Sequence, residues 1–116
     1  PFVALALQTA CRAVNSAADA AASRPLMRAA IDRIAGQIAA SKRFIGPDVR
    51  LVVLPEYFLT GFPMGESTSL WADKAALEID GAEYRRLGEV ARGEDIYLAG
   101  NAYERDRHFP GIYFQA

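Results

Sequence analysis

Residues 50–63, "RLVVLPEYFLTGFP", decide the fold and carry the strongest functional signal in this sequence. Residues 51–54 form an apolar run without alternation, which predicts a strand buried on both faces. Pro55 cannot donate a ladder hydrogen bond, so it ends regular pairing and turns the chain out of the sheet. Glu56 follows directly. The sequence therefore places a carboxylate at the end of its most hydrophobic strand.

Apolar segments on both sides of this strand predict further strands and helices. We expect strands at residues 2–9, 51–54, 96–99 and 112–116, and helices at residues 23–45 and 82–92. In the first helix, apolar side chains recur at helical spacing from Met27 to Ile38. The order strand, helix, strand, helix, strand, strand predicts an α/β layered fold with helices covering a parallel or mixed sheet.

Local signals set the boundaries of these elements. Ser23 and Pro25 look like a helix start, with a capping side chain and a proline in the first turn. Gly46 and the following proline end that helix. Residues 15–24 are small, with polar residues between them and no clear apolar face, and we expect a loop there that can include a helical turn. Residues 57–75 form a long connection with short helical turns near residues 70–76, and a connection of this length is more often functional than idle.

Composition narrows the possible functions. The 116 residues are 52% hydrophobic with a formal net charge of −1, which is typical of a globular domain and argues against nucleic-acid binding. The single cysteine and single histidine exclude a disulfide framework and a His/Cys zinc cluster. No run is long and apolar enough to span a bilayer, and the apolar start lacks the basic flank of a secretory signal. We therefore expect a cytoplasmic protein without a His/Cys metal site and without a nucleic-acid or membrane partner.

Glu56 has two interpretations from its position alone. Functional residues of open α/β sheets lie beyond the carboxyl ends of strands, and a carboxylate walled by Tyr57, Phe58 and Phe62 would lose hydration and become a stronger base. Charged residues also follow buried strands simply because the chain has reached solvent, and position alone favours this second interpretation.

Four segments of the chain resemble the carbon–nitrogen hydrolase (nitrilase) superfamily. "LVVLPEYFLTGFP", residues 51–63, resembles its glutamate motif, in which a hydrophobic strand ends in Pro-Glu before a Gly-aromatic-Pro turn. "FVALALQTA", residues 2–10, is similar to its first strand, and "MRAAIDRIAGQIAASK", residues 27–42, to the helix before the glutamate. "LGEVARGEDIYLAGNAYER", residues 87–105, matches its later helix and strand. The turn after Glu56 is nearer to nitrilase-like members than to others.

The resemblance implies a fold and a mechanism. The fold is a four-layer α-β-β-α sandwich formed when two subunits pair, of which residues 1–116 would be the N-terminal part of one domain. The mechanism uses a Glu-Lys-Cys triad on a nitrile, amide or carbamoyl substrate, with homodimers or larger homo-oligomers and no cofactor. Glu56 matches the general base, and Tyr57 is implied to line the substrate pocket. The lysine and the cysteine would fall beyond Ala116, so residues 1–116 alone are expected to be inactive.

Other residues and other functions have weaker support. Cys11 precedes the glutamate and has no basic partner except Arg12, so we expect a small buried thiol rather than a nucleophile. His108 lies in a charged turn and is expected at the surface. Both ends of the sequence look cut, which suggests part of a longer chain. The alternative function is a non-catalytic α/β interaction module that pairs through its sheet or its apolar connection; a nucleotide-binding domain is disfavoured because no phosphate loop is present.

Overall fold

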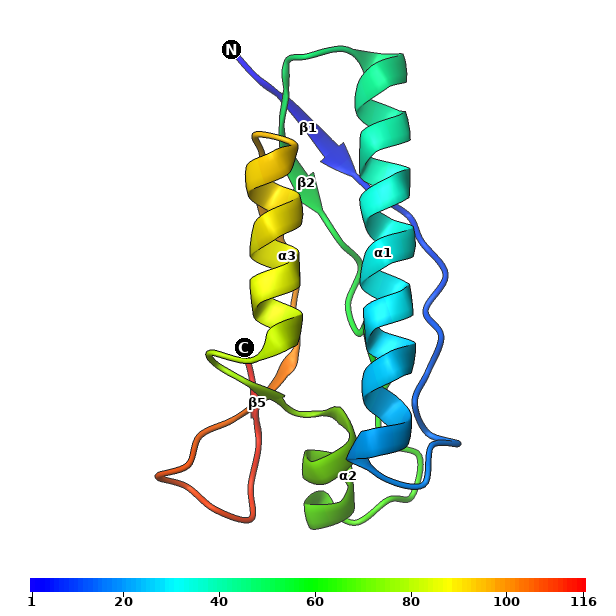
Figure 1. Cartoon of the computed structure of the whole chain (residues 1–116), viewed down its shortest axis with the longest axis vertical. Coiled ribbons are helices and arrows are strands. Elements are labelled where there is room, and N and C mark those ends of the chain that lie inside the picture. The colour runs from blue at the N-terminus through cyan, green and yellow to red at the C-terminus, as the bar shows by residue number, and fades with distance from the viewer.

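The computed structural model describes all of residues 1–116 and shows an α/β arrangement of helices and short strands (Figure 1). The elements along the chain are β1 (Val3–Ala6), α1 (Ala20–Ile45), β2 (Val49–Val53), α2 (Thr68–Ala75), β3 (Leu77–Glu78), α3 (Ala82–Gly93), β4 (Tyr97–Ala99), β5 (Tyr103–Arg105) and β6 (Phe114–Gln115). No helix among them has the length and apolar character needed to cross a membrane. The predicted α/β class is confirmed.

The main sheet has three parallel strands in the order β1-β2-β4, so β2 is central. α1 lies in the connection between β1 and β2, and the connection between β2 and β4 contains α2, β3 and α3. α1 and α3 pack on the main sheet. In Figure 1 these two helices stand side by side in front of the strands, and they contact each other directly. The carboxyl ends of all three strands therefore meet at one edge of the sheet, the edge at which Glu56 follows β2.

Helices cover only one face of this sheet. Val49 and Val52 of β2 are fully buried among the apolar side chains of α1, including Ile31, Ile34 and Ile38. On the opposite face Val53 keeps 41% of its surface exposed. The prediction that this strand is buried on both faces is therefore wrong for residues 1–116, because no helix covers the second face.

α1 begins earlier than its sequence predicts. Asp19 is the N-cap, and its side chain accepts a hydrogen bond from the backbone N–H of Ala22 at 2.9 Å. Ser23 lies inside the helix, so it is not the cap, and Pro25 is an interior helical residue. The run of alanines after Asp19 has the highest helix propensity of any residue type, and it needs no apolar face to be helical. The end of the helix at Gly46, with φ of 127°, is as predicted.

A second small sheet has the strand order β3-β5-β6. It lies beside α2, near the N-terminal end of α1 (Figure 1). β3 and β5 pair in parallel and β5 and β6 are antiparallel. The sequence predicted β6 and the helical turns of α2 but neither β3 nor β5, since segments of two or three residues are too short to show a period. This second sheet brings the C-terminal segment next to the turn that contains Glu56.

Candidate functional site

Glu56 lies in the turn that follows the central strand of the main sheet. Its side chain is exposed, and Oε1 accepts a hydrogen bond from Nε2 of Gln115 at 3.1 Å. Phe58, expected to wall the carboxylate, is instead 3% exposed and part of the hydrophobic core. The predicted position at the strand end is therefore present, whereas the predicted dry environment is not provided by residues 1–116.

Tyr57, the residue after the carboxylate, has a backbone conformation that is unusual for its type. Its φ is 55°, in the left-handed region, which costs a non-glycine residue of order 1–3 kcal/mol. Two contacts hold this conformation. The backbone N–H of Tyr57 donates to Oδ1 of Asn101 at 2.9 Å, and its carbonyl accepts from the N–H of Gly61 at 3.1 Å. The surrounding structure thus fixes the peptide next to Glu56.

Cys11 reaches the same turn from the segment after β1. Its Sγ donates to the carbonyl oxygen of Tyr57 at 3.0 Å. The residue is exposed, so the prediction of a buried thiol is wrong; the chain after β1 runs along the surface toward residues 57–61 rather than into the core. Partial burial of the thiol raises the pKa of Cys11, while the backbone of Gly61 and the charge of Arg33 act in the opposite direction. A thiol kept protonated serves as a hydrogen-bond donor rather than as a nucleophile.

Aromatic rings pack together beside Tyr57. Its ring stacks on Tyr103 of β5, with 5.6 Å between ring centroids and 16° between ring planes. Tyr113 and Trp71 meet Tyr103 edge to face at 5.1 Å and 5.7 Å, in geometries that aromatic pairs favour. Burial, together with Tyr57, raises the pKa of the Tyr103 hydroxyl, which therefore remains neutral. Tyr57 is thus a rigid aromatic surface next to Glu56.

An apolar cavity near this turn does not contain Glu56. It has a volume of about 310 Å³ and lies between α3 and the ends of β2 and β4, where Leu54, Phe58 and Leu87 line it. Asn101 is the polar residue of its lining. The carboxylate of Glu56 instead faces solvent beside Gln115. The cavity and the carboxylate are therefore separate features. Asn101 is next to both, since it lines the cavity and binds the backbone of the turn at Tyr57.

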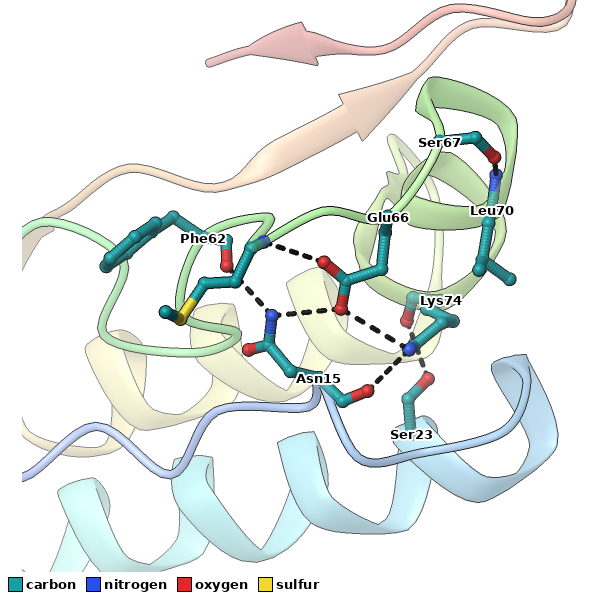
Figure 2. A network of polar contacts seen from close by, with 8 residues as sticks. Asn15, Ser23, Phe62, Glu66, Ser67, Leu70 and Lys74 are labelled. Atoms are coloured by element: carbon teal, nitrogen blue, oxygen red, sulfur yellow. Dashed lines mark hydrogen bonds and ion pairs between the residues drawn. The ribbon is translucent and has the colours of Figure 1, made fainter.

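A second polar cluster fixes the far part of the same connection (Figure 2). Glu66 accepts from the Nδ2 of Asn15 at 3.0 Å and from the backbone N–H of Met64 at 2.7 Å. Lys74 of α2 lies 3.7 Å from Glu66 and donates to the carbonyl of Asn15 at 2.7 Å. Only 4% of the Lys74 side chain is exposed, so this is a buried ammonium held by a carboxylate and a carbonyl.

The charged groups of this cluster, Glu66 and Lys74, interact with each other. The backbone N–H of Met64, with smaller contributions from Asn15 and Lys74, lowers the pKa of Glu66, so the carboxylate is ionised at neutral pH. Ser23 of α1 donates to the carbonyl of Lys74 at 2.6 Å and extends the cluster to the long helix. The cluster therefore joins three parts of the chain (Figure 2): the segment before α1, the connection after Glu56, and the helix α2.

Residues 1–116 bring neither a lysine nor a histidine to the carboxylate. Lys74 is held in the buried cluster, and His108 is exposed in its charged turn, where Nδ1 contacts Asp106 at 2.8 Å. No group of histidine, cysteine and carboxylate side chains is arranged to bind a metal ion. The predicted residues Glu56 and Tyr57 are adjacent as expected, and the structure adds Asn101, Cys11 and Gln115, whose proximity no sequence pattern indicates.

Comparison with known proteins gives one match. The sequence model of the family described as "Carbon-nitrogen hydrolase" matches residues 8–116, which is nearly the whole chain. No curated protein and no solved structure matches.

Proposed function

Because this chain belongs to the carbon–nitrogen hydrolase family, we propose that it hydrolyses the nonpeptide carbon–nitrogen bond of a nitrile, amide or carbamoyl substrate with Glu56 as general base. The observation that carries this proposal is the position of Glu56 directly after the central parallel strand β2. Catalytic residues of open α/β sheets lie at this edge. The rigid turn around Tyr57 also supports it, because a catalytic group must keep one orientation.

The proposed chemistry needs two more residues. A cysteine thiol gives its proton to Glu56 and attacks the nitrile or amide carbon, which yields a thioimidate or a thioester. A lysine stabilises the negative charge of the tetrahedral intermediate. An amide loses ammonia as the thioester forms, whereas a thioimidate takes up one water to lose ammonia and become the thioester. A further water then hydrolyses the thioester, which releases the acid and returns the thiol. Both residues are proposed to lie beyond Ala116, on the strands that follow in this family. We assign Tyr57 to the wall of the substrate pocket, which its ring next to Glu56 supports.

The open face of the main sheet supports a further layer in the intact enzyme. The register places Ala4, Leu51 and Tyr97 in one row across this face, and Ala6, Val53 and Ala99 in a second row. These side chains are apolar, yet Tyr97 is 78% exposed. Apolar sheet faces are normally packed against another layer. We propose that a second sheet covers this face to form the α-β-β-α sandwich, in a homo-oligomer as the resemblance implies. We also propose that the protein is cytoplasmic.

The experiment measures ammonia release by the intact enzyme. Benzonitrile, butyronitrile, propionamide and an N-carbamoyl amino acid sample the three substrate classes, and each yields ammonia on hydrolysis. Substitution Glu56→Gln keeps the size and shape of the side chain but removes the base. We expect its kcat to fall by at least 10³-fold on the best substrate, near the upper end of what general-base catalysis contributes, with the thermal unfolding temperature unchanged.

Glu89→Gln is the matched control, since it neutralises an exposed carboxylate on α3 that pairs with Arg86 of the same helix. It should leave turnover unchanged. Full activity of the Glu56→Gln variant would refute the assignment of the base. The absence of ammonia from every substrate would favour the alternative, an interaction module that pairs through the open sheet face.

A further inference from the structure

The backbone at Tyr57 helps to aim Glu56, whose carboxylate also accepts a hydrogen bond from Gln115. The peptide between Glu56 and Tyr57 is planar, so the direction of the Tyr57 N–H fixes the ψ angle of Glu56. The N–H direction is in turn fixed by its hydrogen bond to Oδ1 of Asn101 at 2.9 Å. A left-handed φ of 55° at a tyrosine is not a conformation that the chain adopts by itself, so contacts from outside the turn must hold it.

Asn101 is well placed to hold the turn because its own backbone is fixed on both sides. On one side, Gly100 packs so closely that an added Cβ would lie 3.1 Å from the ring of Phe58. On the other side, the backbone of Ala102 exchanges two hydrogen bonds of 2.9 Å with that of Ala116. Asn101 therefore projects from a rigid connection between β4 and β5, and its side chain reaches the turn after β2 across 44 positions of sequence.

Three other contacts oppose rotation of the same turn, but none touches the peptide of Glu56. Cys11 Sγ and the backbone N–H of Gly61 both donate to the carbonyl of Tyr57, which belongs to the next peptide. Tyr103 stacks on the Tyr57 ring. Among these contacts, only the hydrogen bond to Asn101 involves the peptide between Glu56 and Tyr57, through the Tyr57 N–H.

We propose that Asn101 is a positioning residue for the general base: through the N–H of Tyr57, it fixes the direction in which Glu56 presents its carboxylate. This inference rests on the proposed function of Glu56. It assigns no contact with substrate to Asn101. Loss of the acceptor allows the Glu56–Tyr57 peptide to rotate, and the base then spends only part of its time in the productive orientation.

The first test compares two substitutions in the intact enzyme. Asn101→Leu has a similar volume and no acceptor, whereas Asn101→Asp keeps an oxygen at the same place. With the best substrate of the ammonia assay, Asn101→Leu should lower kcat by about 10–100-fold and leave KM within about twofold, the result of a misaimed catalytic group. Asn101→Asp should retain kcat within about threefold at pH 8.

A purely structural role gives a different result. It would lower the unfolding temperature of both variants and reduce the folded fraction, with normal kcat per folded molecule. That outcome, or an unchanged kcat in Asn101→Leu, would overturn the inference. If Glu56→Gln were fully active, the proposed function would fail on its own account.

The second test needs no variant, so it remains decisive if Asn101→Leu does not fold. Hydrogen exchange of the Tyr57 amide is measured in the intact wild-type protein by mass spectrometry at single-residue resolution. An amide held by Asn101 should exchange at least 10-fold more slowly than the same amide in an unfolded chain. Exchange at the unfolded rate would show that Asn101 does not hold the peptide, and the inference would fail whatever the activity data show.

Discussion

Gly61 lies so close to the chain that follows β1 that no side chain fits at this position. A Cβ at this position would lie 2.8 Å from the Cβ of Ala13 and 3.3 Å from its Cα, and the φ of Gly61 is +73°. Backbone strain costs alanine about 1 kcal/mol in this region, and the overlap with Ala13 adds about 2 kcal/mol. We expect Gly61→Ala to lower the free energy of unfolding by about 3 kcal/mol in urea denaturation.

Gly111 provides the matched control for that substitution. Its φ is +83°, but a Cβ there would meet nothing within 4 Å. Gly111→Ala should therefore cost only the strain, about 1 kcal/mol. An equal loss of unfolding free energy in the two variants would show that the overlap with Ala13 does not destabilise Gly61→Ala.

Glu66 makes the stability of the protein depend on pH in the acidic range. The backbone N–H of Met64, together with Asn15 and Lys74, lowers its pKa below the ordinary value of 4.5. The ionised form therefore stabilises the folded state fully above the unfolded pKa, and this stabilisation is lost as the pH falls through the folded pKa. We expect Glu66→Gln to be less stable than wild type at pH 7, with the difference shrinking steadily below pH 4.5.

The measurement is urea denaturation at several pH values between 2.5 and 7. Glu94→Gln, a change in a carboxylate whose side chain makes no hydrogen bond, should follow the wild-type curve. A constant difference between Glu66→Gln and wild type at every pH would mean that the carboxylate gains no stabilisation from its partners.

The start of α1 depends on one capping side chain. Asp19 accepts from the backbone N–H of Ala22, one of the N–H groups that have no partner within the helix. Asp19→Ala removes this acceptor and should lower the free energy of unfolding by about 1 kcal/mol. Asp19→Asn keeps a capping oxygen and should stay close to wild type. A similar loss in both variants would assign the effect to charge rather than to the cap.

The same cap shows what sequence reasoning found and what it missed at the scale of elements. Long elements with a clear period were predicted well: the apolar repeat of α1, the helix α3 and the run of β2 all lie where expected. The start of α1 was missed because the alanine run has no apolar face. β3 and β5 were missed because their pairing, and not their composition, makes them strands.

In the candidate site, too, some residues were predictable from a local sequence pattern and others were not. Glu56 was predicted because a proline and an acid at a strand end form a local pattern, whereas Asn101 and Cys11 approach Tyr57 from 44 and 46 positions away in the sequence. The pairing of Glu66 with Lys74 likewise needs the folded path of the connection. Such contacts carry no spacing that a single sequence displays.

A substitution on the open face of the main sheet should affect stability differently in residues 1–116 and in the proposed intact enzyme. Val53 is 41% exposed on this face, so Val53→Lys should change the stability of residues 1–116 by less than about 1 kcal/mol. In the proposed sandwich the same lysine is buried without a partner, and we expect a loss of more than about 3 kcal/mol or failure to fold.

Thermal and urea denaturation of both forms make this comparison. Val53→Ala keeps the face apolar and is the control, with a moderate loss expected only in the intact enzyme. If the lysine is tolerated equally in both forms, a second sheet does not cover this face.

The parallel order of the main sheet also determines how long β1 remains unpaired during synthesis of the chain. Val3 of β1 pairs with Val49 of β2, 46 positions further along the chain, and β1 has no other strand beside it. At ribosomal speeds of 5–20 residues per second, β1 waits about 2 to 9 s for its partner to be made. During that delay the nascent chain exposes an apolar segment, which is an opportunity for chaperones to bind and a risk of aggregation on crowded polysomes.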